Sequence, residues 1–168
     1  MRILVATQEE FDLANKYLTG YDVMKIGVGA GNVIRRCSGI RSDEKCINMG
    51  FAGSNTLPIG KVTKVSKTYR LRDENVEFED YRNGYELSPV GYPCYTANDF
   101  VTSTDKLEPV LFDMELNYIA AFRFRLLGAV KIVSDNLMVD AYNESVNIDD
   151  HLIWEKVKAL CDEISRTS

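Results

Sequence analysis

Short runs of consecutive apolar residues alternate along this chain with segments whose apolar residues recur at helical spacing. "RILVA", "KCINMG" and "GAVKIVSDN" have the length and composition of buried strands. "EEFDLANKYL" and "NIDDHLIWEKVKALCDEIS" show the clearest helical spacing, and Asn147 can cap the second of these helices. The alternation predicts an α/β fold of three layers, with a mainly parallel or mixed central sheet flanked by helices.

The segment "FDMELNYIAAF", residues 112–122, leads into a predicted helix that runs from Glu115 to about Leu127. Two acids, Asp113 and Glu115, stand at the start of this otherwise apolar helix. Acids in the first turn of a helix accept backbone N–H groups and interact favourably with the positive end of the helix dipole. This capping role is the simplest interpretation, so a functional role for Glu115 needs support from other parts of the chain.

The composition is that of an ordinary soluble globular protein, with 45% hydrophobic and 27% charged residues. A length of 168 residues suits one domain, residues 1–168, with its own core. The net charge of −5 argues against nucleic acid or an anionic membrane as the main partner. No apolar run approaches the roughly 20 residues of a membrane span, and the acids soon after "MRILVA" do not suit a secretory signal. We therefore expect a cytoplasmic protein.

The sequence lacks the patterns of a metal or dinucleotide site. The four cysteines, at positions 37, 46, 94 and 161, show no C-x-x-C spacing, and with one histidine they do not make a zinc site. Reduced thiols are the expected state. In "GVGAGN", Asn32 stands where the dinucleotide fingerprint requires its third glycine. We expect neither a metal nor an organic cofactor.

Ligands of parallel α/β sheets bind beyond the C-terminal ends of the strands. Acids, glycines and one aromatic residue follow the predicted strands of this chain: Glu10, Gly29, Gly53, Phe100, Glu115 and Asp135. These residues would converge on one rim of the sheet, which predicts a binding site there. Asp135 follows a buried strand, where partial desolvation favours the protonated form of a carboxyl and suits a general acid. The alternative for Asp135 is an Asx-turn or a helix cap.

Six motifs occur in sequence at the predicted strand ends: "ATQEEF" (6–11), "GVGAGNV" (27–33), "INMGFAGS" (47–54), "TANDFV" (96–101), "DMELNYIA" (113–120) and "VSDN" (133–136). In this order they resemble the nucleoside phosphorylase/nucleosidase family, closest to the 5′-methylthioadenosine/S-adenosylhomocysteine and futalosine nucleosidases. The chain resembles a shortened member of that family. The resemblance implies one nucleoside phosphorylase-like domain over residues 1–168, with a site where the N-glycosidic bond of a ribonucleoside is broken.

The resemblance also implies catalytic and ribose-binding roles. Asp135 would protonate the departing base, and Glu10 would activate the attacking water. Glu115 would hold the ribose 2′- and 3′-hydroxyls, because a carboxylate can accept hydrogen bonds from two neighbouring hydroxyls, and Met114 would pack against the sugar. Negative charge at Glu115 also suits a sugar that becomes cationic at the transition state.

Further residues would bind the base and surround the nucleophile. Phe100 would stack on the base, and the backbone of Val101 would read its edge. The loops that contain Gly29, Phe51 and Gly53 would form the water or phosphate site.

The chain departs from typical family members at several points. Phe51 stands where many nucleosidases have a small or hydroxyl residue. Lys131 stands where they commonly have arginine, which keeps the positive charge but loses the planar fork. The chain also lacks an extra β-hairpin between Glu10 and Gly27 and has little room for a helix between "TANDFV" and "DMEL". These departures bear on the substrate more than on the reaction class.

Water is favoured over phosphate as the nucleophile. The family's phosphorylases place arginine near the first glycines, whereas here Arg35 and Arg36 lie in the following helix and Glu10 would repel phosphate. The expected function is an N-ribosyl hydrolase for a purine or modified-purine ribonucleoside, in nucleoside metabolism or salvage. The alternatives are a phosphate-dependent purine nucleoside phosphorylase and a non-catalytic nucleoside-binding protein.

The family resemblance implies a homo-oligomer, with a dimer favoured, in which a neighbouring subunit covers the 5′ side of the nucleoside. The tyrosine-rich segment 69–95 would serve such an interface or a lid, or would form an ordinary polar surface loop. The expected partner is a small-molecule nucleoside, with neither nucleic acid nor membrane.

Overall fold

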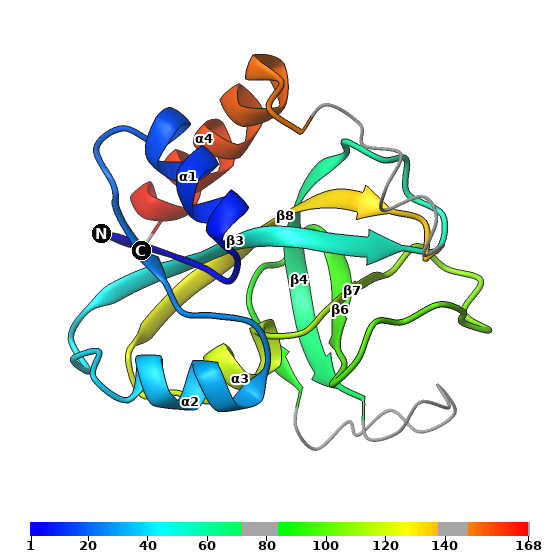
Figure 1. The fold of residues 1–168 in the computed structure, drawn as a ribbon, viewed down its shortest axis with the longest axis horizontal. Coiled ribbons are helices and arrows are strands. Elements are labelled where there is room, and N and C mark those ends of the chain that lie inside the picture. Colours follow the sequence, from blue (N-terminus) through cyan, green and yellow to red (C-terminus); the bar gives the residue numbers. More distant parts are fainter. Residues whose placement is uncertain (72–83, 138–147, 168) are drawn as a thin grey trace.

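The computed structural model describes residues 1–71, 84–137 and 148–167. Strands and helices follow one another in the order β1 (Arg2–Val5), α1 (Gln8–Tyr17), β2 (Asp22–Lys25), α2 (Ala30–Cys37), β3 (Lys45–Ser54), β4 (Val62–Arg70), β5 (Tyr85–Glu86), β6 (Tyr92–Thr96), β7 (Leu111–Asp113), α3 (Leu116–Ala120), β8 (Arg125–Asp135) and α4 (His151–Arg166). In Figure 1, α1 and α4 lie on one side of the long strands and α2 and α3 on the other.

The strands form one mixed sheet. β1 pairs in parallel with β2 and β3, and β3 pairs in parallel with β8. β8 then pairs antiparallel with β4, β4 pairs in parallel with β6, β6 pairs in parallel with β7, and β7 returns antiparallel to β3. Five strands therefore close a ring, while β1 and β2 extend the sheet beyond β3. The mixed sheet flanked by helices confirms the predicted fold class.

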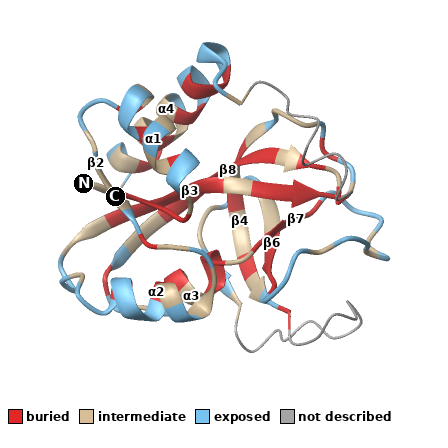
Figure 2. Ribbon diagram, viewed as in Figure 1, coloured by how far each residue is buried: buried red, intermediate tan, exposed pale blue. Residues whose placement is uncertain are grey.

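Apolar side chains fill both faces of the sheet and the inside of the ring. Trp154 of α4 and Met49 of β3 are buried between the sheet and the helices α1 and α4. Ile26 and Ile119 are buried between the sheet and the helices α2 and α3. Leu111 lies in the cluster inside the ring. Figure 2 shows that the outer helices are mostly exposed on their outward faces, while the long strands between them are buried. This is the three-layer arrangement that the sequence predicts.

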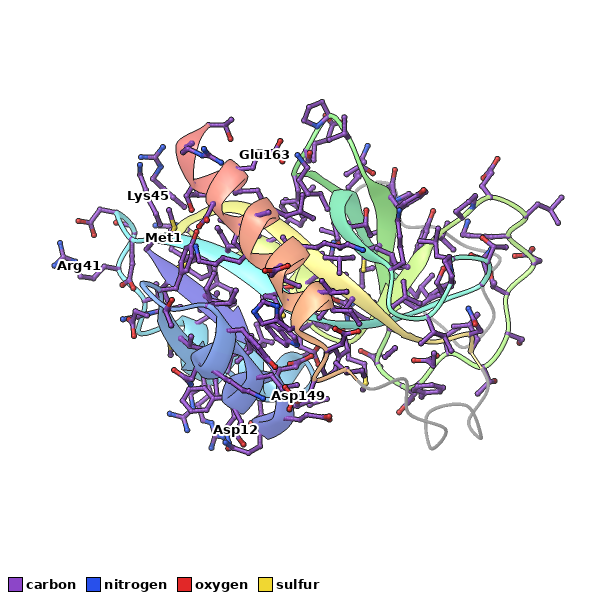
Figure 3. The ribbon with its side chains drawn as sticks, turned by 90° about the horizontal axis from the view of Figure 1, so that it is seen from above. Met1, Asp12, Arg41, Lys45, Asp149 and Glu163 are labelled. Carbon is purple, nitrogen blue, oxygen red and sulfur yellow. The ribbon has the colours of Figure 1, made fainter. Side chains whose placement is uncertain are left out.

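Helix α4 lies across β8 and beside α1 when the molecule is seen from above (Figure 3). Gly128 permits this close packing, because a Cβ atom there would lie 3.2 Å from Cδ1 of Ile164. α4 begins at His151, and Asp150 is its N-cap, accepting a hydrogen bond from the Leu152 N–H at 2.8 Å. The predicted cap, Asn147, lies outside the described residues and is too early in the chain to cap this helix. None of the described helices is long and apolar enough to cross a membrane.

A helix is present where the sequence predicts one, but the predicted end at about Leu127 is wrong. Helix α3 ends at Ala120, and β8 already begins at Arg125. Residues 125 and 126 pair with Lys45 and Cys46 of β3, so strand pairing overrides the helical tendency of the apolar run. The apolar run alone does not distinguish these two outcomes, because a short apolar run suits either a buried helix or a buried strand.

The tyrosine-rich segment 69–95 is described only in part. β5 pairs antiparallel with β4 through Lys67–Glu86 and Thr68–Tyr85. Residues 72–83 lie outside the described residues. The role of the segment as an interface or lid stays a prediction.

Candidate active site

A cavity of about 530 Å³ opens where β1, β7 and β8 end, beside the last residues of β3. Of the nine residues that the sequence predicts for the site, seven line this cavity: Glu10, Phe51, Gly53, Phe100, Met114, Glu115 and Asp135. They come from distant parts of the chain. Glu10, Gly53 and Asp135 meet because β1, β3 and β8 pair in parallel and end at one rim, whereas Met114 and Glu115 directly follow the short β7, which runs antiparallel to the end of β3. The structure thus brings together the residues that the motifs predict, and their chemical roles are taken up as proposals below.

The other two predicted residues adjoin the same cavity. Val101 lines a small hollow of about 30 Å³ that shares Gly53, Phe100 and Asp135 with the main cavity. The backbone N–H of Gly29 donates a hydrogen bond to Oε1 of Glu115 at 2.9 Å. Gly29 has φ +80, a left-handed conformation in which glycine is strongly favoured, and so the turn depends on glycine here.

Glu10 lies in the first turn of α1, and its carboxylate accepts hydrogen bonds from three backbone N–H groups. Its Oε2 accepts hydrogen bonds from Ala6 at 2.7 Å and Thr7 at 2.9 Å, and its Oε1 accepts one from Phe51 at 2.8 Å. The bond to Thr7 completes a capping box with the Thr7 hydroxyl, which accepts from the Glu10 N–H. The Glu10 carboxylate therefore caps the N-terminus of α1, links α1 to β3 through the Phe51 N–H, and also lines the cavity. Gly50 leaves room for it, since a Cβ there would lie 2.9 Å from Oε1.

Glu115 lies between β7 and α3, and its side chain is buried. Burial, followed by the charge of Asp113, raises the pKa of Glu115 to about 7, while Lys131 and the Gly29 N–H act in the opposite direction. Glu115 is the N-cap residue of α3 by position, but it makes no side-chain capping hydrogen bond. The capping interpretation therefore holds for Asp113, whose Oδ2 accepts from the Leu116 N–H at 3.1 Å, and not for Glu115.

A buried ion pair inside the ring of strands supports this end of the cavity. Lys131 Nζ lies 2.7 Å from Asp113 Oδ2, and both side chains are 1% exposed. The Thr96 hydroxyl donates to Oδ1 of Asp113 at 2.6 Å. Burial alone would lower the pKa of Lys131, but the charges of Asp113, Cys94 and Glu115 outweigh it and raise that pKa. Lys131 is therefore held as a cation behind the cavity wall.

Asp135 ends β8 and is 1% exposed. Its Oδ1 accepts a hydrogen bond from the Leu137 N–H at 2.9 Å, which is the Asx-turn contact that the sequence left open as an alternative. Its Oδ2 accepts from the Ser134 hydroxyl at 2.9 Å. Leu137 has φ 64, unusual for a residue with a branched side chain, and this backbone turn keeps the carboxyl at the cavity wall. Asp135 thus forms the turn and lines the cavity at once.

Gly53→Ala tests how closely Asp135 is positioned. A Cβ at Gly53 would lie 2.8 Å from Asp135 Oδ1 and 2.9 Å from Leu137 Cδ2, so the carboxyl must move. If Asp135 takes part in the reaction, we expect kcat to fall by about 10²-fold, as displacements of this kind do. Gly31→Ala is the matched control, because a Cβ there meets no atom within 4 Å. Equal kcat values for the two variants would show that the position of Asp135 does not matter.

The described lining contains acids but no basic side chain. Glu10, Asp113, Glu115 and Asp135 line the cavity, and its described residues include no lysine, arginine or histidine. The buried Lys131 is already paired with Asp113. Such a lining disfavours an anionic ligand and tolerates a neutral or cationic one.

The sequence pattern did not predict the Lys131–Asp113 pair. A signal was present, because Lys131 interrupts the apolar run "GAVKIV", and a charge in a buried strand requires a partner. The identity of that partner depends on β7 entering the ring, which local spacing does not reveal.

Comparisons with known proteins support the fold. No protein-family model and no curated protein matches the sequence. Among solved structures, MTAN of Chlamydia trachomatis is 17% identical with a TM-score of 0.72, covering 97% of this chain and 97% of that chain. Futalosine hydrolase of Helicobacter pylori is 14% identical with a TM-score of 0.69, covering 96% of this chain and 97% of that chain.

A third structure is 5′-methylthioadenosine/S-adenosylhomocysteine nucleosidase of Helicobacter pylori. It is 15% identical with a TM-score of 0.65, and the match covers 96% of this chain and 97% of that chain. A mutant of the Helicobacter pylori MTAN holds 5′-methylthioadenosine in its active site. At these identities the likeness establishes the fold: this chain folds as the 5′-methylthioadenosine/S-adenosylhomocysteine nucleosidases and futalosine hydrolase do.

Proposed function

We propose that this protein is an N-ribosyl hydrolase that cleaves the N-glycosidic bond of a purine or modified-purine ribonucleoside with water. The observation that carries the proposal is the cavity itself. Three carboxyl groups, those of Glu10, Glu115 and Asp135, line it together with Phe100 and Met114. Structures that share the fold include two kinds of nucleosidase. The proposal places the protein in cytoplasmic nucleoside metabolism or salvage.

The three carboxyl groups have separate tasks in the proposed reaction. The bond between C1′ and the base nitrogen breaks with its electron pair going to the base, and Asp135 donates a proton to that base. The oxygen of a water molecule bonds to C1′, and Glu10 accepts the proton that the water loses. Ribose and the neutral base are the products. The ionised Glu115 accepts hydrogen bonds from the 2′- and 3′-hydroxyls and stabilises the positive charge that develops on the sugar.

Phe100 and Val101 would bind the departing base. Both residues line the small hollow next to Asp135, and Phe100 also lines the main cavity, so a base held in the main cavity against Phe100 has its ring atoms within reach of the proton donor. An aromatic ring such as that of Phe100 offers a flat face for stacking. Met114, which lines the same hollow and the main cavity, would contact the sugar between base and nucleophile.

Hydrolysis is favoured over phosphorolysis by the charge of the lining. A phosphate nucleophile needs cations or a cluster of N–H donors. Here the N–H groups of Ala6, Thr7 and Phe51 are already bonded to the Glu10 carboxylate. Arg35 and Arg36 lie on the exposed side of α2 and are not among the described residues that line the cavity. The site is therefore suited to activate a neutral water molecule.

A phosphate titration tests this choice of nucleophile. The rate of base release from a cleaved ribonucleoside is measured in phosphate-free buffer and then with increasing phosphate at constant ionic strength. We expect full activity without phosphate and free ribose as the sugar product. A rate proportional to phosphate, with ribose 1-phosphate as the product, would identify a phosphorylase and remove the role assigned to Glu10.

The raised pKa of Glu115 predicts a pH dependence. The ionised carboxylate is the form that accepts two hydroxyl hydrogen bonds, and its pKa in the folded protein is about 7. We therefore expect kcat/KM for a ribonucleoside to rise as the pH increases through about 7. Glu115→Gln should lower kcat/KM and remove this limb of the pH profile. A variant that keeps the same limb would assign it to another group.

A further inference from the structure

The chain segment 98–109, between β6 and β7, forms one side of the cavity. Phe100 and Thr102 line the main cavity, and Val101 lines the small hollow beside it. The segment itself belongs to no helix or strand. Its position must therefore come from contacts with the rest of the molecule rather than from backbone pairing along its length.

Tyr118 fastens the first end of segment 98–109. Its hydroxyl donates a hydrogen bond to Asn98 Oδ1 at 2.6 Å, and the guanidinium of Arg70 lies 5.0 Å from its ring centroid. Tyr118 is in α3, three residues after Glu115. The bond to Asn98 therefore joins the helix that follows the proposed ribose carboxylate to the segment that carries Phe100.

Asn55 fastens the other end. Its side-chain amide donates to the carbonyl groups of Lys106 and Glu108, both at 2.9 Å, and its Oδ1 accepts from the Val110 N–H at 3.0 Å. Asn55 directly follows β3 and lies two residues after Gly53 in the chain. Three hydrogen bonds from one side chain therefore hold the returning part of the segment to the end of β3.

Between these two ends, the segment rests on a cluster of aromatic residues. Val101 packs against the buried cluster that contains Tyr95 and Phe112, and Lys106 Nζ lies 4.6 Å from the centroid of the Tyr95 ring. Phe100 is 44% exposed, so burial of its ring alone does not fix its position.

We propose that Tyr118 and Asn55 are positioning residues for the base, acting through the two ends of segment 98–109. Neither side chain is among the described residues that line the cavity, so neither would touch the nucleoside. Loss of either fastening lets Phe100 and Val101 move away from the base while Glu10 and Asp135 keep their own hydrogen bonds. The affinity for the base then falls and the chemical step does not. This inference rests on the proposed function.

Tyr118→Phe tests the first fastening, since it removes one hydroxyl and keeps the ring beneath Arg70. We expect KM for the nucleoside and the dissociation constant for the free purine base, measured by calorimetry, to rise about fivefold, with kcat within about twofold of wild type. Tyr17→Phe is the matched control. It removes a hydroxyl that donates to Asp149 Oδ1 at 2.7 Å, between α1 and the turn before α4. Neither residue is among the described residues that line the cavity, so the change should leave KM unchanged.

A double-mutant cycle shows whether Tyr118 acts through Asn98. Asn98→Ala should raise KM as much as Tyr118→Phe, and the double variant should raise it no further. Asn55→Asp keeps an acceptor for Val110 but loses the donors to Lys106 and Glu108, and should also raise KM without lowering kcat. The inference would be overturned if KM is unchanged in these variants, or if their kcat falls while KM stays the same. It would also be overturned if the effects of Tyr118→Phe and Asn98→Ala on KM add in the double variant. A wild-type protein that neither binds nor cleaves purine ribonucleosides would overturn the proposed function, and this inference with it.

Discussion

Asp135→Asn is expected to lower kcat for a neutral purine ribonucleoside by about 10²–10⁴-fold, the usual contribution of a general acid. The amide keeps an oxygen for the Leu137 N–H and can donate to the Ser134 hydroxyl, so the turn at the end of β8 is retained. It cannot give a proton to the departing base. The measurement is the initial rate of base release, followed by liquid chromatography, together with the thermal midpoint to confirm that the variant is folded.

Asp12→Asn is the matched control for this experiment. Asp12 lies on the outer side of α1 (Figure 3). Its carboxylate accepts a hydrogen bond from the Gln8 side chain at 2.8 Å. The control should keep the wild-type rate. Wild-type activity in Asp135→Asn would exclude Asp135 as the general acid. Absence of turnover in the wild-type protein itself would favour the non-catalytic alternative.

Lys131→Met is expected to destabilise the fold by about 3–5 kcal/mol, because it leaves the Asp113 carboxylate buried and without its cation. The free energy of unfolding from urea titrations gives the effect. Adding Asp113→Asn to Lys131→Met removes the second charge and should restore a large part of the lost stability, since the pair is coupled.

A surface pair provides the comparison for Lys131→Met. Lys158 Nζ lies 2.7 Å from Asp162 Oδ2 in α4, with the two side chains 40% and 38% exposed. Lys158→Met should cost about 0.5 kcal/mol or less, as exposed pairs of this spacing do. A similarly small loss of unfolding free energy for Lys131→Met would mean that water or another group stabilises the Asp113 carboxylate. That result would contradict a buried, water-excluded Lys131–Asp113 pair.

The sequence was sufficient to predict that several of these residues meet at one cavity, because they follow strands. Glu10, Gly53 and Asp135 come after or at the ends of β1, β3 and β8, which pair in parallel and so end at one rim. Knowing that these are parallel buried strands is enough to place the three residues together, without knowing which strands are neighbours. The chemistry of each residue is still a proposal.

The features that escaped prediction depend on contacts between distant segments. The boundary between α3 and β8 is set by pairing of Arg125 and Leu126 with β3, which local apolar spacing does not contain. The cap of α4 is Asp150 rather than Asn147, and a run of polar residues before a helix offers several candidates of similar chemistry. The closing of five strands into a ring likewise requires knowledge of the pairing.

The measurement that tests the central proposal most directly is an end-point assay by liquid chromatography and mass spectrometry. Purified protein is incubated in phosphate-free buffer with ordinary, 5′-thio and modified purine ribonucleosides, and each product is identified by mass. The account predicts release of the free base and free ribose or its 5′-substituted form from at least one of them. No release from any member, with or without added phosphate, while one member raises the thermal midpoint, would contradict the proposed hydrolase and indicate a nucleoside-binding protein.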